Sequence, residues 1–487
     1  MKKAALTLLI LFLILSGVLL IRTAAFRPAQ AAVRPAPAEE ISGAVLERLA
    51  GAVRFRTVSF EPSRAAETDR AAFAAFLGYL EKSFPLVHAR LEREVIGSFA
   101  LHFRWPGRRP ELKPILLLAH MDVVPAAEGA QSGWTHPPFD GTVADGFLWG
   151  RGALDDKQAL LGILEAAEKL LGEGFVPERG IDLAFGCDEE VGGEEGAAQI
   201  AEKLRAAGRS FEFILDEGLT IMEDGLSGLA RPVALIGTSE KGYASLDLSV
   251  RSEGGHSSVP PKQTAIGILA RAVSRLQDHL FPAHLRQPTL DMLRAVGPEM
   301  PFMKKLFMAN LWLFSRPLLA VMAGSPPSSA LIRTTTAPTI FQAGVKDNVL
   351  PGEARAVVNF RILPGDTVAG VVEHVRSVIA DDRVVIAARP DAREPSRVSP
   401  GDSAAFGTLR ETILQVFPEV LVAPGLMVGG TDSRRYDALS PNIFRFTPIR
   451  LKTADLARMH GIDERISERG YKDEIRFMVR LIRNVSL

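Results

Sequence analysis

The chain has 487 residues, more than one average domain holds, so two or more domains are expected. Its 47% hydrophobic content predicts an ordinary globular core, and the equal numbers of basic and acidic residues, 57 each, argue against a nucleic-acid-binding protein. The single cysteine, Cys187, excludes an intrachain disulfide and a cysteine-built zinc site.

The N-terminus carries a long apolar run, Ala4–Ile21, which two lysines precede and Arg22 follows. Such a run spans ~27 Å as a helix, enough to cross a bilayer core, whereas the apolar part of a signal peptide is ~7–15 residues long. We therefore favour a signal anchor over residues 1–24, with a cleaved signal peptide as the alternative because Ala29–Ala31 offers small residues. In both cases the body is expected outside the cytoplasm, in the periplasm or the extracellular space. Residues 25–40 are rich in Ala and Pro, which is typical of a linker.

Residues 41–240 alternate between apolar strands and amphipathic helices and form the first part of the predicted catalytic domain. This alternation predicts an α/β fold, a largely parallel sheet with helices on both faces. The expected helices are 41–53, 65–84, 158–171 and 194–207, and the expected strands are 99–103, 115–119, 181–186 and 213–215.

The pattern changes near Glu240, and residues 241–389 are predicted to form an inserted α+β domain with an antiparallel sheet in βαββαβ order. Its expected strands are 244–251, 340–343, 354–362 and 384–388, with helices over 265–276 and 368–379. Met303–Met322 is strongly apolar and without a firm period. The sequence is compatible with three roles for this segment: core packing, the lining of an acyl-chain tunnel, and contact with a membrane or a partner subunit. Residues 390–487 return to the first pattern and complete the catalytic domain, with helices over 403–417 and 471–485 and a strand over 442–445.

Acids and histidines cluster where predicted strands or Gly-rich turns end. Each cluster alone is typical of a capped turn, a helix start or a surface residue, but their conjunction in one α/β layer predicts a metal site. Carboxylate oxygens with imidazole nitrogens suit Zn²⁺, with Mn²⁺ or Co²⁺ as alternatives, and two metal ions need a bridging carboxylate, terminal ligands and a general base. The clustered residues are His120, Asp122, Asp155, Asp156, Glu189, Glu190, Asp216, Glu217 and His460.

Several of these runs, in the same order, resemble the M20 metallopeptidase family, which includes carboxypeptidases and aminoacylases. The resemblance covers about residues 45–485 and implies a zinc-peptidase-type mixed sheet with an inserted lid and dimerisation domain. The runs that carry it are LAHMDVVP at 118–125, GRGALDDK at 150–157, DEEVGG at 188–193, DEG at 216–218 and GGHSS at 254–258.

The resemblance also implies roles for individual residues. It implies that Asp155 is the ligand that bridges two zinc ions and that the peptide bond between Asp155 and Asp156 is cis. It leaves Asp216 as an alternative to Glu217 as a metal ligand. Glu189 matches the general base, and Asp122 matches the acid that orients a ligand histidine. The remaining metal ligands implied are His120, Glu190, Glu217 and His460.

Three further residues are implied to act on the substrate. His256 matches a histidine that, in dimeric relatives, stabilises the oxyanion in the partner's site. Asn348 and Arg361 resemble positions that hold the substrate carboxylate, with Arg333 as a further candidate.

We therefore expect a di-zinc amidohydrolase that cleaves, and in reverse forms, the amide bond of N-acyl amino acids with apolar acyl groups. The alternative within the same chemistry is a metallo-carboxypeptidase or dipeptidase acting on short peptides. A different class, a catalytically inactive metal-binding or carrier protein, is disfavoured because Glu189 is present. Expected contacts are a small-molecule substrate, a membrane through the N-terminal helix, a homodimer through the inserted domain, and no nucleic acid.

Overall fold

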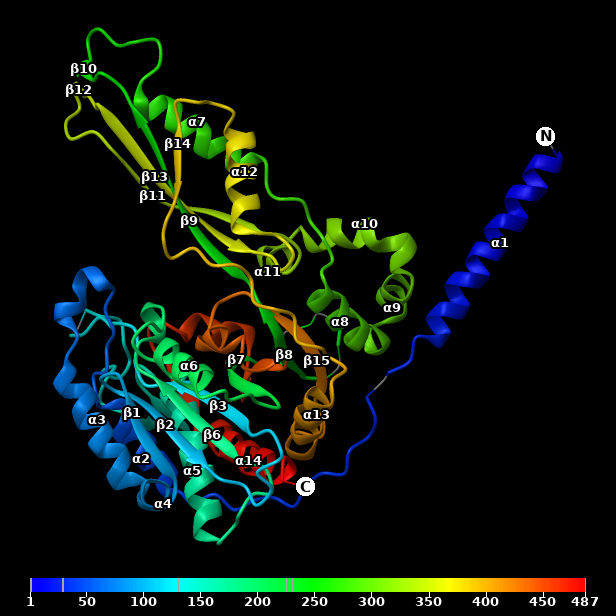
Figure 1. The fold of residues 1–487 in the computed structure, drawn as a ribbon. Helices are drawn as coiled ribbons and strands as arrows, with labels where there is room; N and C mark the ends of the chain where they lie inside the picture. Colours follow the sequence, from blue (N-terminus) through cyan, green and yellow to red (C-terminus); the bar gives the residue numbers. More distant parts are fainter. Residues whose placement is uncertain are drawn as a thin grey trace.

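The computed structural model describes residues 2–28, 30–129, 131–224, 226, 228–229 and 231–486. Figure 1 shows a body built around the larger sheet, an elongated inserted unit that rises from it, and a helix, α1, that projects from the side. α1 spans Lys2–Ala25 and is the one helix, within the described residues, that is long and apolar enough to cross a membrane. A signal sequence has the same features.

An eight-stranded mixed sheet forms the centre of the body, in the order β1-β2-β6-β3-β7-β16-β8-β15. β3, β6 and β7 run parallel to one another, whereas β1 and β2 are antiparallel additions at the edge. Every residue of β3 and β6 is buried, as expected for apolar strands covered on both faces. The predicted mixed sheet is thus confirmed, with these strands: β1 (Glu92–Ile96), β2 (Ala100–Trp105), β3 (Ile115–His120), β6 (Ile181–Gly186), β7 (Ile214–Met222), β8 (Val233–Glu240), β15 (Leu421–Met427) and β16 (Ile443–Leu451).

Helices of the body present apolar faces to this sheet. α5 (Lys157–Gly172), α13 (Ala404–Val416) and α14 (Glu468–Asn484) pack side by side, and α6 (Ala197–Ala206) lies apart from them against β2 and β6. Hydroxyl caps begin α13 and α14, where Ser403 and Ser467 accept hydrogen bonds from backbone N–H groups three residues on. The other helices and strands of the body are α2 (Ala44–Val53), α3 (Arg70–Ser83), α4 (Pro85–Arg90), β4 (Thr142–Ala144), β5 (Phe147–Trp149) and β17 (Arg465–Ser467).

The inserted unit has an antiparallel sheet in the order β11-β13-β9-β14 and a hydrophobic core of its own. α7 and α12 cover one face of that sheet, with a two-stranded ribbon at the far tip (Figure 1). The strands are β9 (Gly242–Arg251), β10 (Gly255–His256), β11 (Thr335–Ala343), β12 (Val349–Leu350), β13 (Glu353–Ile362) and β14 (Val385–Ala388), and the helices are α7 (Ala265–Asp278) and α12 (Val368–Ile379).

One expected strand boundary is wrong, and several elements were not expected. The strand expected to end before Asp216 continues as β7 to Met222, so Asp216 and Glu217 lie within a strand. β1, β8 and β15 of the central sheet were not expected, and residues 277–330, which showed no firm period, contain short helices. These helices are α8 (Gln287–Val296), α9 (Phe302–Ala309), α10 (Leu311–Met322) and α11 (Pro326–Ala330).

Residues 25–40, predicted to be a linker, form hydrogen bonds to the body. The Gln30 side chain donates to the Val420 carbonyl (3.1 Å) and accepts from the Val422 N–H (2.9 Å). Ala36 N–H donates to the Gln415 carbonyl. The segment after α1 is thus held along β15 and α13, because these hydrogen bonds satisfy backbone groups at the edge of the sheet.

Candidate metal centre

The parallel pairing of β3 with β6 brings His120 and the turn after Gly186 together. His120 is the last residue of β3 and pairs with Gly186, the last residue of β6. The Asp122 carboxylate accepts hydrogen bonds from the backbone N–H groups of Glu189 and Glu190, both at 3.1 Å, and lies 3.3 Å from His120 Nδ1. Asp122 therefore connects the two strand ends and orients the His120 imidazole.

Asp155 lies between two histidines that are far apart in sequence. Its Oδ1 is 3.0 Å from His120 Nε2, and its Oδ2 is 3.1 Å from His460 Nε2. Each histidine nitrogen also faces a glutamate: His120 Nε2 is 3.5 Å from Glu217 Oε1, and His460 Nε2 is 3.1 Å from Glu190 Oε2. The five ligands that the resemblance implied thus form two groups that share one carboxylate.

The neighbouring acids are turned to other partners. The Asp216 carboxylate accepts from the backbone N–H of Ser433 (2.7 Å) and of Glu217 (3.0 Å), so Glu217, rather than Asp216, lies beside His120. Asp156 is fully buried and accepts from the His120 N–H at 3.2 Å. The peptide bond between Asp155 and Asp156 is cis, as expected.

A buried pair, Arg151 and Glu464, holds the Asp155 turn against the His460 loop, and sequence reasoning missed it. Glu464 accepts from Arg151 Nη1 at 2.5 Å and from the N–H groups of Leu154 and Asp155. Arg151 Nη2 donates to the His460 carbonyl at 3.1 Å. The one available signal was the acid four residues after His460, which sequence alone does not distinguish from a surface residue.

The electrostatics of the site favour bound cations. Burial raises the pKa of Glu189 to about 8, with His120 and Arg434 opposing the rise and Glu190 adding to it. Burial and the nearby Asp155 raise the pKa of Glu217 well above its usual range. Burial would also raise the pKa of Asp155, but hydrogen bonds from His120 and His460 hold it below its ordinary value. Crowded buried carboxylates are stabilised by positive charge.

The donor set fits a divalent metal. The ligand atoms of His120, Asp155 and Glu190 lie within 4.8 Å of one another, and so do those of His120, Asp156 and Glu217. Within the described residues, the buried Glu190 Oε1 has no hydrogen-bond partner, which leaves an acceptor oxygen for a ligand bond. Carboxylate oxygens with imidazole nitrogens, and no thiolate, are suited to zinc and to harder divalent ions.

Three arginines lie close enough to Glu189 for their charges to act on it. Arg434 Nη1 is 3.5 Å from Glu189 Oε1 and donates to the Thr431 carbonyl. The guanidinium carbons of Arg361 and Arg393 are 5.0 and 5.1 Å from the centre of the Tyr243 ring. Sequence reasoning had predicted Arg361 but assigned no role to Arg393 or Arg434.

The other predicted substrate residues lie at the tip of the inserted unit, where Figure 1 shows β10 and β12. His256 Nδ1 accepts from Ser258 Oγ at 2.7 Å, and the Asn348 carbonyl accepts from the Ser257 N–H. Tyr243 and Arg251 stand at opposite ends of β9, about 26 Å apart at 3.3 Å per residue. One chain therefore does not bring His256 and Asn348 to its own Glu189. The carbonyl of Arg333, the further candidate, accepts from Lys241 Nζ at 2.8 Å.

The sequence profile of peptidase family M20/M25/M40 matches residues 116–484. Among curated proteins, the chain is 45% identical to probable carboxypeptidase S-like 2 of Dictyostelium discoideum over 440 residues, covering 90% of this chain and 84% of that protein. It is 43% identical to N-fatty-acyl-amino acid synthase/hydrolase PM20D1 of Xenopus tropicalis, covering 92% and 87%. It is 32% identical to carboxypeptidase S of Saccharomyces cerevisiae, covering 91% and 84%.

Solved structures share the fold at low sequence identity. An M20 family metallo-carboxypeptidase from Sulfolobus solfataricus superposes with a TM-score of 0.67 at 17% identity, covering 92% of this chain and 100% of that one. Human carnosine dipeptidase 1 superposes with a TM-score of 0.63 at 14% identity, covering 91% and 96%. The architecture described above is thus shared over nearly the whole length of both chains.

Proposed function

Because the chain belongs to peptidase family M20/M25/M40, whose enzymes are metallohydrolases that typically use zinc, we propose that it hydrolyses the amide bond of N-acyl amino acids with a two-metal site. The same site would catalyse condensation when the free acid and amino acid are in excess. The observation that carries the two-metal assignment is the position of Asp155, whose two oxygens face two different histidines.

In this proposal His120, Asp155 and Glu217 hold one zinc ion, and Asp155, Glu190 and His460 hold the other. Mn²⁺ or Co²⁺ would fit the same donors. The bound ions would supply a Lewis acid for the substrate carbonyl and lower the pKa of a water molecule.

Glu189 is the proposed general base. It lies among the ligands without being required as one, and its backbone is held by Asp122. Its carboxylate accepts a proton from the attacking water and returns it to the nitrogen of the leaving amino acid. Burial raises the pKa of the Glu189 carboxyl, whereas the positive charges of His120 and Arg434 oppose the rise, and bound cations would act in the same direction and favour the carboxylate that a base requires. The Arg434 guanidinium lies 3.5 Å from the Glu189 carboxylate and pairs with it.

Arg361 and Arg393 are proposed to bind the carboxylate of the amino acid part. Burial lowers the pKa of both guanidinium groups, and the positive charge of nearby Arg434 lowers each further. A carboxylate placed between them would relieve this repulsion, and the fork of an arginine binds a carboxylate through two parallel hydrogen bonds. Both guanidiniums contact the Tyr243 ring, which helps to position them.

A carboxypeptidase is the second candidate, favoured by the 45% identity to a carboxypeptidase S-like protein. Both reactions release a free amino acid, so the two candidates differ only in the group on the carbonyl side of the amide bond that is cleaved. Turnover of N-oleoyl-phenylalanine is to be compared with that of a Gly-Leu type dipeptide. We expect faster cleavage of the acyl amino acid. Dipeptide cleavage without acyl-amino-acid activity would replace the first candidate by the second.

The metal-binding alternative without catalysis is tested by Glu189→Gln, which keeps the size of the side chain and removes the base. We expect turnover to fall by at least about a thousandfold, while zinc content stays the same. Equal activity of Glu189→Gln and wild type would refute Glu189 as the base.

Two further proposals concern the location of the protein and its assembly. We propose that α1 anchors the protein in a membrane, with the body on the extracytoplasmic side, since two lysines precede the apolar run. We also propose a homodimer formed through the inserted unit, since His256 and Asn348 lie too far from their own Glu189 to act on the same substrate.

A further inference from the structure

The helical hairpin formed by α9 and α10, residues 302–322, presents an apolar surface to the solvent. Its exposed side chains include Trp312, which is 57% accessible, and Val321, which is 76% accessible. Of the twenty residues in the two helices, Met322 alone is buried. Exposed apolar area of this extent on an ordered pair of helices indicates an interaction surface. The other large exposed side chains of the hairpin are Phe302, Met303, Phe307 and Leu313.

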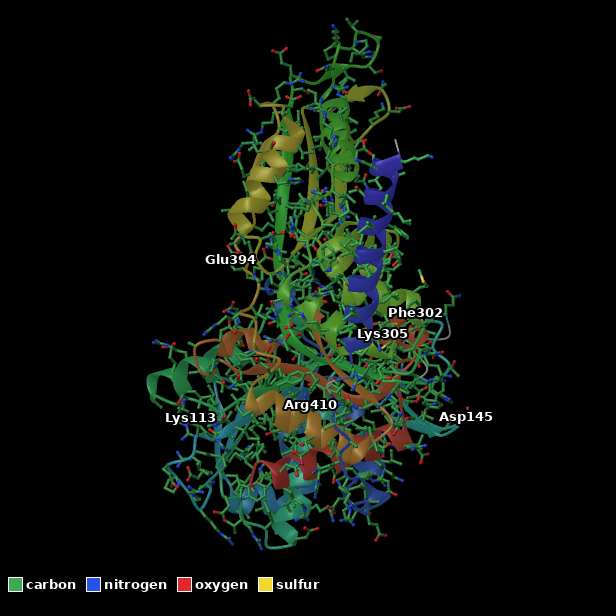
Figure 2. The ribbon with its side chains drawn as sticks, turned by 90° about the vertical axis from the view of Figure 1, so that its right-hand side faces the viewer. Lys113, Asp145, Phe302, Lys305, Glu394 and Arg410 are labelled. Atoms are coloured by element: carbon green, nitrogen blue, oxygen red, sulfur yellow. The ribbon has the colours of Figure 1, made fainter. Side chains whose placement is uncertain are left out.

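The hairpin is fastened to the end of α1. Asn310, between α9 and α10, is fully buried, and its Nδ2 lies 3.3 Å from both the Leu19 carbonyl and Thr23 Oγ1 of α1. The same nitrogen donates to the Leu306 carbonyl at 2.9 Å, so the amide is well satisfied where the helices meet. Figure 2 shows Phe302 and Lys305, both of α9, beside the base of α1.

This attachment sets the level of the hairpin along α1. The apolar run of α1 ends at Ile21, and Arg22 follows it. Leu19 and Thr23 lie on either side of that boundary, which is where a membrane-spanning α1 would leave the hydrocarbon for the headgroup region. Just beyond the boundary, the Phe26 ring and Met308 of α9 both lie against Gly297, which keeps the end of α1 near the hairpin.

The charge of the hairpin matches a membrane surface. Residues 300–346 contain no aspartate or glutamate, whereas Lys304, Lys305 and Arg316 lie within the two helices. Helices that lie in the headgroup region combine Trp, Phe and Leu on one face with Lys and Arg near it, and anionic lipids strengthen their binding. A long surface without acidic residues suits an anionic membrane, whereas a partner protein would not require it.

We propose that the α9–α10 hairpin is a second membrane-binding element, which lies in the headgroup region of an anionic bilayer beside α1. It would hold the body at a fixed orientation to the membrane, because α1 alone permits rotation about its own axis. The hairpin would then be the part through which the inserted unit and the body contact the bilayer. This inference does not depend on the chemistry of the metal centre, but it rests on insertion of α1.

The test uses the full chain reconstituted into vesicles of phosphatidylcholine with about 30% phosphatidylglycerol. Cys187, the single cysteine, is buried and is replaced in Cys187→Ser. An environment-sensitive fluorophore is then attached through Val321→Cys, or through Val345→Cys as the matched control. Val345 is 97% accessible and lies outside the hairpin, in the loop between β11 and β12. Flotation with the vesicles first establishes that α1 inserts.

We expect lipids that carry a nitroxide near the headgroup to quench the label at position 321 at least about twofold more than the label at position 345. Brominated lipids should also quench the fluorescence that is lost in Trp312→Phe, which isolates Trp312 from the other tryptophans. Equal quenching at 321 and 345 in chains that float with the vesicles would overturn the proposal. Disulfide-linked dimers through Val321→Cys without lipid quenching would assign the surface to a second copy, which also overturns it.

Discussion

Glu474 provides a test of how burial in this fold controls protonation. It lies in the middle of α14, is fully buried, and neither carboxyl oxygen has a hydrogen-bond partner within the described residues. Gly162 of α5 packs against it so closely that a Cβ there would lie 3.4 Å from Glu474 Cγ. Burial alone raises the pKa of Glu474 to about 8. The perturbation is Glu474→Gln, which keeps the shape and cannot ionise.

The sign and size of the effect follow from the two pKa values. The unfolded chain releases the proton near its ordinary value of 4.5 and the folded chain near 8, so between these values the folded state binds more protons. Stability therefore falls as the pH rises through that window, and the loss is complete above the folded value. At ~1.4 kcal/mol for each pH unit, the loss is about 3 kcal/mol at pH 7 and at most about 5 kcal/mol.

The assay is urea unfolding of the full chain in detergent at pH 5, 6, 7 and 8, followed by tryptophan fluorescence. The free energy of unfolding of the variant will differ from that of wild type by a constant, which reflects the buried amide, and by a second contribution that changes with pH. We expect the free energy of unfolding of Glu474→Gln, relative to wild type, to rise by about 3 kcal/mol from pH 5 to pH 8. Glu81→Gln, at an exposed position of α3, should show no such slope. A flat difference for Glu474→Gln would refute the reasoning.

The remaining predictions concern the metal centre. Removal of metal by a chelator should abolish turnover and lower the Tm, and zinc at 100 Kd or more should restore about 3 kcal/mol of stability, as measured by thermal unfolding. Asp122→Asn places an amide against the N–H of Glu189 or Glu190, so we expect roughly 10–100-fold weaker zinc binding in competition titrations, and unchanged affinity would contradict the role of Asp122. Glu464→Gln should cost about 2–4 kcal/mol in urea unfolding, because it leaves a buried guanidinium without its counter-charge. An equal mixture of Glu189→Gln and His256→Ala chains, exchanged as dimers, should recover about a quarter of wild-type activity if His256 acts in the partner's site and none if it acts in its own.

The sequence predicted the centre of the sheet well, because apolar strands that are buried on both faces leave a strong and simple signal. The strand predicted over 181–186 is β6 without change, and that over 115–119 is β3 less one residue. The predicted acid clusters after these strands lie together because parallel strands end at one edge. Local pattern and resemblance thus predicted that His120, Glu189 and Glu190 lie at one edge of the sheet.

The parts that escaped prediction depend on contacts between distant segments. β8 and β15 pair with each other, although almost 200 residues separate them, and neither is periodic enough to be recognised alone. Arg151 and Glu464 are ordinary charged residues until the fold buries them as a pair. The helices α9 and α10 were missed for a different reason: their exposed apolar side chains break the inside–outside pattern that helix prediction relies on.

The long-range contacts also explain how so many carboxylates can share one site. Asp122 is held by two backbone N–H groups of the Glu189 turn, and Glu464 by N–H groups of the Asp155 turn and by Arg151. These hydrogen bonds fix the turns that carry Glu190 and Asp155 through backbone N–H groups and the Arg151 guanidinium. We expect the repulsion among the crowded carboxylates to favour the binding of positive charge. Variants in these supporting acids should weaken metal binding more than a surface change does, because they release the turns on which Glu190 and Asp155 are fixed.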